Sequence, residues 1–308
     1  MRKLKILGFF CLAILSLQSC NKDEYEVITK GETIPTASKF QSLFDQQFAN
    51  ITTVKTFDAS GTLNYTSPKG VKLTIVGSCL RKNGSPVTGA VQVVYAEIFD
   101  KGSMLITNKP TMGKSGGILL PLLSGGEFYI QALQEGVKLT STCAISLEVP
   151  TSLTGGTDTA MTSFDGNIDS NGELTWEKST SVDLSVSPKA IPTYNALFQD
   201  FGWFNCDRFS TTSGPKTTIT TLVPSGYNTL NTAVYLTTKS IPNSLGKSYG
   251  QFPVGMDCSI IFITEKDGKF RYAIKPQILT ANHEVTFSLS ETSLATASEL
   301  KAIINALP

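Results

Sequence analysis

Residues 258–275, CSIIFITEKDGKFRYAIK, carry the clearest local signal of fold in this chain. Two runs rich in β-branched and aromatic residues flank the dipeptide Asp267-Gly268. Asp-Gly favours a two-residue hairpin turn, because both residues accept the positive φ angles that such a turn requires. The stretch therefore predicts a β-hairpin, with strands on either side of Asp267-Gly268.

Shorter runs of the same kind recur along most of the chain. Residues 73–76 and 91–95 alternate apolar and polar side chains on either side of a turn at Asn83-Gly84. A second hairpin is expected around Asn171-Gly172. The remaining expected strands are 118–123, 128–132, 144–149, 166–168, 173–176, 203–209, 217–223, 233–239 and 285–289. Short strands with frequent turns are typical of sheet packed on sheet, so the predicted fold class is all-β.

Two amphipathic segments and one proline-containing stretch divide the chain. Residues 38–50 place phenylalanines and leucine at helical spacing, with Thr36 or Ser38 as the N-cap. Residues 294–307 show the same periodicity and predict a closing helix. Pro188 to Pro192 is typical of a boundary. We expect a first β-sandwich domain over 38–188 and a second over 189–308, with short N- and C-terminal helices.

The first 19 residues have the pattern of an export signal. Basic residues precede an apolar run of about a dozen residues, which is too short to span a bilayer. The following Leu17-Gln18-Ser19-Cys20 resembles a bacterial lipobox. That resemblance implies cleavage after Ser19 and attachment of lipid to the Cys20 thiol, with residues 20–37 as a tether. The alternative is an ordinary secretory signal with an incidental cysteine.

Composition limits the remaining classes. Loss of the signal would leave 23 basic and 25 acidic residues, so the chain has no excess charge to attract nucleic acid. Lys22-Asp23-Glu24 follows Cys20 and resembles the export tag of Bacteroidota surface lipoproteins, or else is a solvated linker. We expect an outer-membrane location facing the cell exterior, with the membrane as partner through Cys20.

Four cysteines remain after Cys11 and Cys20 are set aside. Cys79 and Cys143 lie in the first half and Cys206 and Cys258 in the second, so one disulfide per domain is the economical pairing. Four buried free thiols are the alternative. No Cys-x-x-Cys occurs and His283 is the single histidine, so the sequence predicts no metal site and no cofactor.

An aromatic stretch at 198–209 supplies the candidate ligand residues. Trp203 with Asp207 and Arg208 would suit a sugar, by ring stacking and hydrogen bonds to hydroxyls; the alternative is that these residues fill a core. An exposed Trp176 would also favour binding.

Catalysis is not expected. One histidine without a Gly-x-Ser-x-Gly elbow offers no hydrolase triad. Residues 167–178 lack the last ligand of a calcium loop, which leaves a hairpin as the better interpretation. Carboxylate pairs such as Glu97 with Asp100, or Glu127 with Glu135, occur in any β protein of this length.

Several short stretches together resemble one family. They are 66–73 (TSPKGVKL), 89–93 (GAVQV), 124–130 (SGGEFYI) and 202–209 (GWFNCDRF). They resemble the tandem β-sandwich modules of uncharacterised Bacteroidota surface lipoproteins, the last through a Trp-x-Asn-Cys-Asp-Arg-Phe element. The resemblance implies architecture and location and brings no activity.

The function expected is that of a non-catalytic binding or accessory module for a glycan or peptide at the cell surface. Two alternatives remain. One is a structural or adhesive component that contacts other proteins through sheet edges. The other, less favoured, is a glycoside hydrolase, which would require two facing carboxylates.

Overall fold

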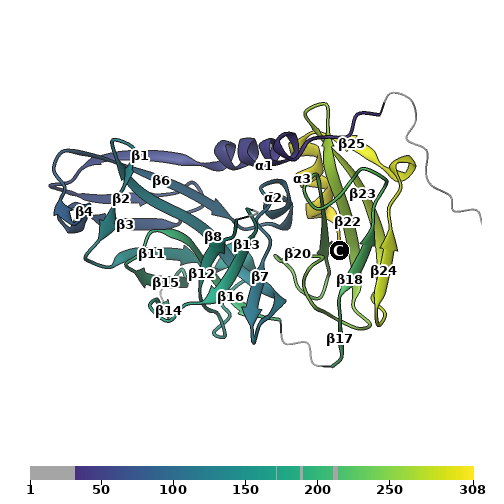
Figure 1. Cartoon of the computed structure of the whole chain (residues 1–308). Coiled ribbons are helices and arrows are strands. Elements are labelled where there is room, and N and C mark those ends of the chain that lie inside the picture. The colour runs from purple at the N-terminus through teal and green to yellow at the C-terminus, as the bar shows by residue number, and fades with distance from the viewer. Residues whose placement is uncertain (1–31, 171, 188–189, 211–213) are drawn as a thin grey trace, which may run out of the picture.

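The computed structural model describes residues 32–170, 172–187, 190–210 and 214–308, and it consists mostly of strands (Figure 1). The described residues contain three α-helices: α1 (Ala37–Ile51), α2 (Lys101–Ile106) and α3 (Ala297–Ala306). None of these helices has the length and apolar character needed to cross a bilayer. The all-β prediction is confirmed at this level. The signal, Cys20, Lys22-Asp23-Glu24 and Asn171 lie outside the described residues.

The N-terminal part, residues 53–209, is built on a large sheet with strand order β1-β6-β8-β16-β12-β13-β7, and β9 pairs with β8. The strands are β1 (Thr53–Asp58), β6 (Ala90–Ile98), β7 (Met112–Ser115), β8 (Ile118–Gln134), β9 (Val137–Lys138), β12 (Thr162–Ile168), β13 (Leu174–Lys178) and β16 (Gly202–Phe209). Strand β7 pairs with both β13 and β8. Strands β8, β16, β12, β13 and β7 therefore close into a small barrel at one end of the sheet.

A second sheet covers the open end of the first. Its order is β14-β15-β11-β3-β2, from β2 (Thr62–Thr66), β3 (Lys72–Val76), β11 (Ile145–Pro150), β14 (Asp183–Ser187) and β15 (Thr193–Phe198). Inward residues of both sheets form one apolar core that includes Ile75, Tyr95 and Phe128. A small sheet of β4 (Leu80–Lys82), β5 (Ser85–Pro86) and β10 (Thr140–Ser141) lies beside it.

The predicted boundary at 188/189 does not match the strand pairing. Strands β15 and β16 follow it in sequence, yet β15 pairs with β11 and β16 pairs with β8 and β12. The last strand of the N-terminal part ends at Phe209. Strands β14 and β15, which lie on either side of the predicted boundary, pair with each other in one sheet.

The C-terminal part, residues 214–308, contains the sheet β20-β19-β22-β23-β25. Its strands are β19 (Thr232–Thr237), β20 (Gly246–Lys247), β22 (Asp257–Lys266), β23 (Lys269–Ile278) and β25 (Ser293–Ala295). The predicted hairpin is confirmed, because Lys266 pairs with Lys269 and both turn residues have positive φ. Residues 294 and 295, expected in the last helix, belong to β25.

The C-terminal part is not a free-standing sandwich of two equal sheets. One face of its sheet packs on the parallel pair β18 (Ile219–Leu222) and β24 (His283–Thr286) and on the short pair β17 (Lys216–Thr217) and β21 (Phe252–Pro253). The other face packs on the three helices and on the barrel, in a junction core that includes Phe44, Trp203 and Phe270. The two parts therefore share the junction core, while each also has a core of its own.

Helix α1 bridges the two parts, as Figure 1 shows. Thr36 caps it by accepting a hydrogen bond from the Lys39 amide, one of the two caps expected. Its apolar face buries Phe40, Leu43 and Phe44, and the Phe44 ring lies 6.0 Å from that of Phe270 in β23. Helix α2 was not predicted, because its six residues are too few to show helical periodicity.

Candidate functional site

The two tryptophans proposed as ligand contacts are core residues. The side chain of Trp176 is 0% exposed and that of Trp203 is 9% exposed. Trp176 donates its indole N–H to the carbonyl of Pro110 at 3.0 Å. A buried indole has no face left for a sugar, so the interpretation of 198–209 as an exposed stacking platform is wrong and its alternative, a core, is right.

The alternation of β16 explains the Trp-x-Asn-Cys-Asp-Arg-Phe element structurally. Phe204 and Cys206 point into the core between the two sheets, while Trp203 belongs to the junction core. A bulge between Asn205 and Asp207 shifts the pairing with β8.

Asp207 is fully buried and accepts hydrogen bonds from residues of β8 and β16. It accepts from the backbone N–H of Gly125 at 3.2 Å and from the side-chain amide of Asn205 at 2.5 Å. Burial raises the pKa of the Asp207 carboxyl well above its ordinary value, while hydrogen bonds from Ser124, Gly125 and Asn205 oppose that rise. The residue stabilises the bulge and is closed to external ligands.

Glu127, considered above only as one member of a possible carboxylate pair, is a buried polar group without hydrogen-bond partners. It pairs with Asn205 across β8 and β16, is fully buried, and neither carboxyl oxygen has a hydrogen-bond partner. Burial raises its pKa well above the ordinary value, the neighbouring Asp207 raises it further, and the Lys109 ammonium opposes the rise. The carboxyl therefore resists ionisation.

Replacement of Glu127 by methionine is expected to stabilise the protein at about pH 8 by roughly 1–3 kcal/mol, because no hydrogen bond is lost and no charge is buried. The folded pKa lies above the unfolded one, so Glu127 favours folding most at low pH, and that contribution falls as pH rises above the unfolded value. The advantage of the variant should thus shrink between about pH 8 and pH 4 in urea titrations.

The matched control is Glu177→Met, because Glu177 is an exposed carboxylate paired with Lys114. It should change stability little at either pH. A destabilised Glu127→Met variant would mean that the wild type holds an ionised Glu127 against Lys109.

Arg208, the third candidate ligand residue, is engaged within the chain. Its Nε donates to the carboxylate of Asp158 at 2.6 Å, and both side chains are half-buried. The hydrogen bond from Arg208 lowers the pKa of Asp158. The pair ties the 158–160 turn to β16.

The cysteine prediction is half right. Cys79 and Cys143 form a disulfide that ties the start of β4 to the segment before β11. Cys206 and Cys258 are buried free thiols in two different cores, so the predicted second bridge is wrong. Burial raises the pKa of Cys258 to about 12 and raises that of Cys206 well above its ordinary value, which keeps both thiols protonated and unreactive.

The groups considered for catalysis are dispersed. His283 is buried on β24, where its Nδ1 lies 3.2 Å from the backbone nitrogen of Thr280. Glu97 accepts from the Tyr95 hydroxyl, and Asp100 caps α2. Within the described ranges, no three His, Cys, Asp or Glu side chains converge as metal ligands would.

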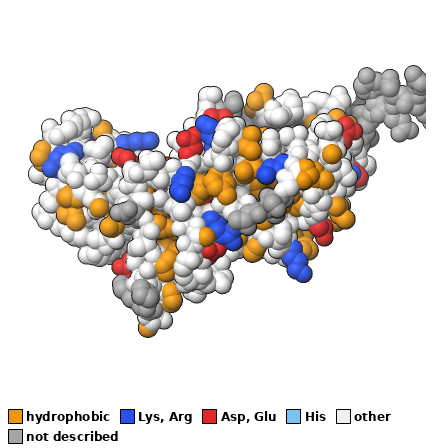
Figure 2. All heavy atoms as spheres, turned by 90° about the horizontal axis from the view of Figure 1, so that it is seen from below, with side chains coloured by type: hydrophobic (Ala, Val, Ile, Leu, Met, Phe, Trp, Pro, Cys, Tyr) orange, Lys and Arg blue, Asp and Glu red, His pale blue; other side chains and the backbone are white. Residues whose placement is uncertain are grey.

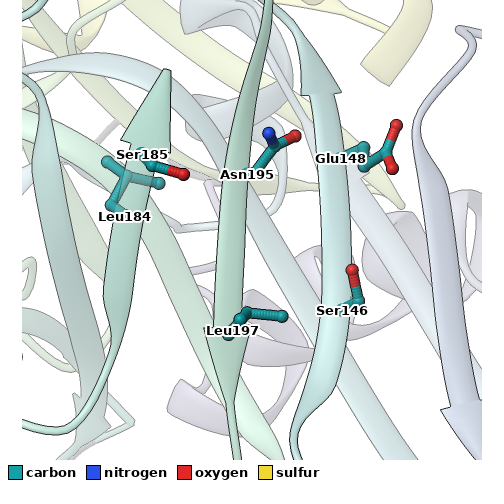
Figure 3. Close-up of a pocket in the computed structure, with 6 residues that line it drawn as sticks. All are labelled: Ser146, Glu148, Leu184, Ser185, Asn195 and Leu197. Atoms are coloured by element: carbon teal, nitrogen blue, oxygen red, sulfur yellow. The ribbon is translucent and has the colours of Figure 1, made fainter. Parts of the chain in front are cut away.

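A shallow hollow of about 440 Å³ lies on the outer face of β14, β15 and β11 (Figure 3). Strand register explains its lining. Asn195 stands directly between Ser185 on β14 and Glu148 on β11, and Leu197 is opposite Ser146. The full lining is Ser146, Glu148, Leu184, Ser185, Asn195 and Leu197.

The hollow combines a row of polar side chains with two leucines, Leu184 and Leu197. Hydroxyl, amide and carboxylate groups follow one another across three strands, and Lys72 Nζ lies 3.8 Å from Glu148 at the end of the row. Leu197 beside them is 48% exposed. Figure 2 shows lysine and arginine side chains standing apart among acidic and uncharged ones, with no continuous basic tract among the described residues seen there.

Comparison with known proteins adds no assignment. No family model matches the chain, and no curated protein or solved structure matches it. Function is therefore inferred from the chain's own residues.

Proposed function

We propose that this chain is a lipid-anchored cell-surface protein that binds a glycan without modifying it, using the hollow on β14, β15 and β11. Location and anchoring at Cys20 rest on the resemblance of residues 1–24 to the leaders of Bacteroidota surface lipoproteins. We also propose that the two parts derive from the tandem β-sandwich modules of that family.

The row of groups in the hollow is the observation that supports glycan binding. Asn195, Ser185 and Ser146 offer both donors and acceptors, which suits the paired hydroxyls of a sugar. The exposed Leu197 offers an apolar surface for the C–H face of a pyranose ring. A rigid sheet holds these side chains at fixed spacing, so little entropy is lost on binding.

The carboxyl groups in the hollow favour non-catalytic binding over hydrolysis. Glycosidases use two carboxyl groups on either side of the scissile bond. Among the described side chains that line the hollow, Glu148 is the single carboxylate.

Leu197→Asp in the mature chain, residues 20–308, is expected to weaken glycan binding at least ten-fold, because a charge replaces the apolar contact (about 1.4 kcal/mol per ten-fold). An array of neutral oligosaccharides identifies the ligand class, and calorimetry with the best hit gives the affinity. Leu222→Asp is the matched control, since Leu222 is 44% exposed on β18, outside the hollow.

If Leu197→Asp and Leu222→Asp bind the glycan equally well, the binding site lies outside the hollow. Binding to extended peptides but to no glycan would replace the proposed ligand class.

A further inference from the structure

The first described residues of the chain are seated on the C-terminal part. Glu32 Oε1 lies 3.0 Å from a guanidinium nitrogen of Arg271 and 3.7 Å from the ammonium of Lys266, at the end of the β22–β23 hairpin. All three side chains are mostly buried. An ion pair shielded in this way is screened by salt less than a surface pair.

Two neighbouring contacts reinforce this ion pair. Asn231 donates its side-chain N–H to the Pro35 carbonyl at 3.1 Å and to the Gly226 carbonyl at 3.2 Å. Ile34 lies against Gly226, where an added Cβ would fall within 2.2 Å of the Ile34 side chain. We call residues 32–36 with Arg271, Lys266, Asn231 and Gly226 the clamp.

The junction between the two parts is packed, so the two parts form one rigid unit. The clamp therefore fixes the position of residues 32–36 relative to both parts. The backbone of Thr111 donates to the Leu245 carbonyl at 2.9 Å, and the Leu245 amide donates to the Thr111 hydroxyl at 2.8 Å. Lys247 of β20 is paired with Glu173, which precedes β13. Together with the shared core, these contacts oppose any swing of one part against the other.

We propose that the C-terminal part is a membrane-proximal pedestal that presents the N-terminal part, and its hollow, away from the bilayer. The inference rests on the proposed anchoring at Cys20. Twelve residues join Cys20 to Glu32 and reach at most about 40 Å. Helix α1 then runs about 22 Å from the clamp toward β1. Figure 1 shows β14 and β15 in the part of the molecule away from β23 and β25.

Energy transfer to a labelled bilayer tests this orientation. The mature chain, residues 20–308, is coupled through its Cys20 thiol to a maleimide lipid in phosphatidylcholine vesicles. Among the described residues Cys79 and Cys143 are bonded and Cys206 and Cys258 are buried, so coupling is directed to Cys20. An azide-bearing amino acid, placed at Leu230 or at Leu197, carries the donor dye.

Leu230 is next to Asn231 of the clamp and is 64% exposed, so it reports on the pedestal, whereas Leu197 reports on the hollow. Acceptor lipids are expected to quench the donor at Leu230 at least twice as strongly as the donor at Leu197. Equal quenching, or stronger quenching at Leu197, would overturn the proposal.

Glu32→Lys reverses the charge at the clamp and leaves the strands untouched. It is expected to narrow the difference between the two quenching values, because release of residues 32–36 from Arg271 and Lys266 lengthens the free tether by about 17 Å. Glu291→Lys is the matched control, since Glu291 pairs at 2.7 Å with Lys275, which lies on β23 as Arg271 does, and is not part of the clamp. Unchanged quenching in Glu32→Lys would overturn the role of the clamp.

The coupling is chemical and no ligand is added. A failure of lipid attachment in cells, or of glycan binding, is therefore observed separately and leaves the quenching result intact.

Discussion

Replacement of Trp203 by alanine is expected to lower the free energy of unfolding by roughly 3–5 kcal/mol. The indole centroid lies 5.2 Å from the ring of Tyr129, 5.3 Å from that of Phe48 and 6.2 Å from that of Trp176. Lys109 Nζ lies 5.5 Å from the same ring. Truncation would open a cavity where α1 meets the barrel, so both parts of the molecule should lose stability together.

Urea unfolding followed by circular dichroism measures this loss, and Leu230→Ala is the control. Leu230 is exposed, so its truncation should change stability by less than about 0.5 kcal/mol. A loss below about 1 kcal/mol for Trp203→Ala would contradict the packing described and would restore an accessible indole at this position.

Removal of the Cys79–Cys143 disulfide is expected to cost about 4 kcal/mol in the chain-entropy description. The two residues are 64 positions apart, so the bridge removes much of the freedom of the unfolded chain. The double variant Cys79→Ala/Cys143→Ala should show a lower urea midpoint than the wild type in the absence of reductant.

Reductant provides the control for the disulfide. It should lower the midpoint of the wild type toward that of the double variant and leave the variant unchanged. A wild-type midpoint that is insensitive to reductant would contradict the expected contribution.

Local sequence signals predicted local structure. The Asp267-Gly268 hairpin and the cap of α1 follow from residues that are neighbours in the chain, and both were predicted. The sheets to which β15 and β16 belong were not predicted, because their partners β11 and β8 precede them by dozens of residues. Nothing in a run of apolar residues states which earlier strand it joins.

The candidate site likewise depended on contacts between residues that are distant in sequence. Tryptophan at 203 is compatible with a platform or a core, and burial by Phe48, distant in sequence, decided between them. The hollow was missed because Ser146, Ser185 and Asn195 are ordinary outward residues until the register places them in line. The Cys206 prediction failed since proximity in sequence does not place two thiols in one core.

The 17-residue strand β8 has a consequence for the order in which the parts of the chain become stable during synthesis. It forms part of both the sandwich and the barrel, and it stays unpaired along one edge until residues 202–209 have emerged to supply β16. Helix α1 can bury its apolar face only later, because that face packs on β23, which begins at residue 269. A chain that emerges from its N-terminus would thus keep this sheet edge open, and free to pair with other strands, until β16 has appeared.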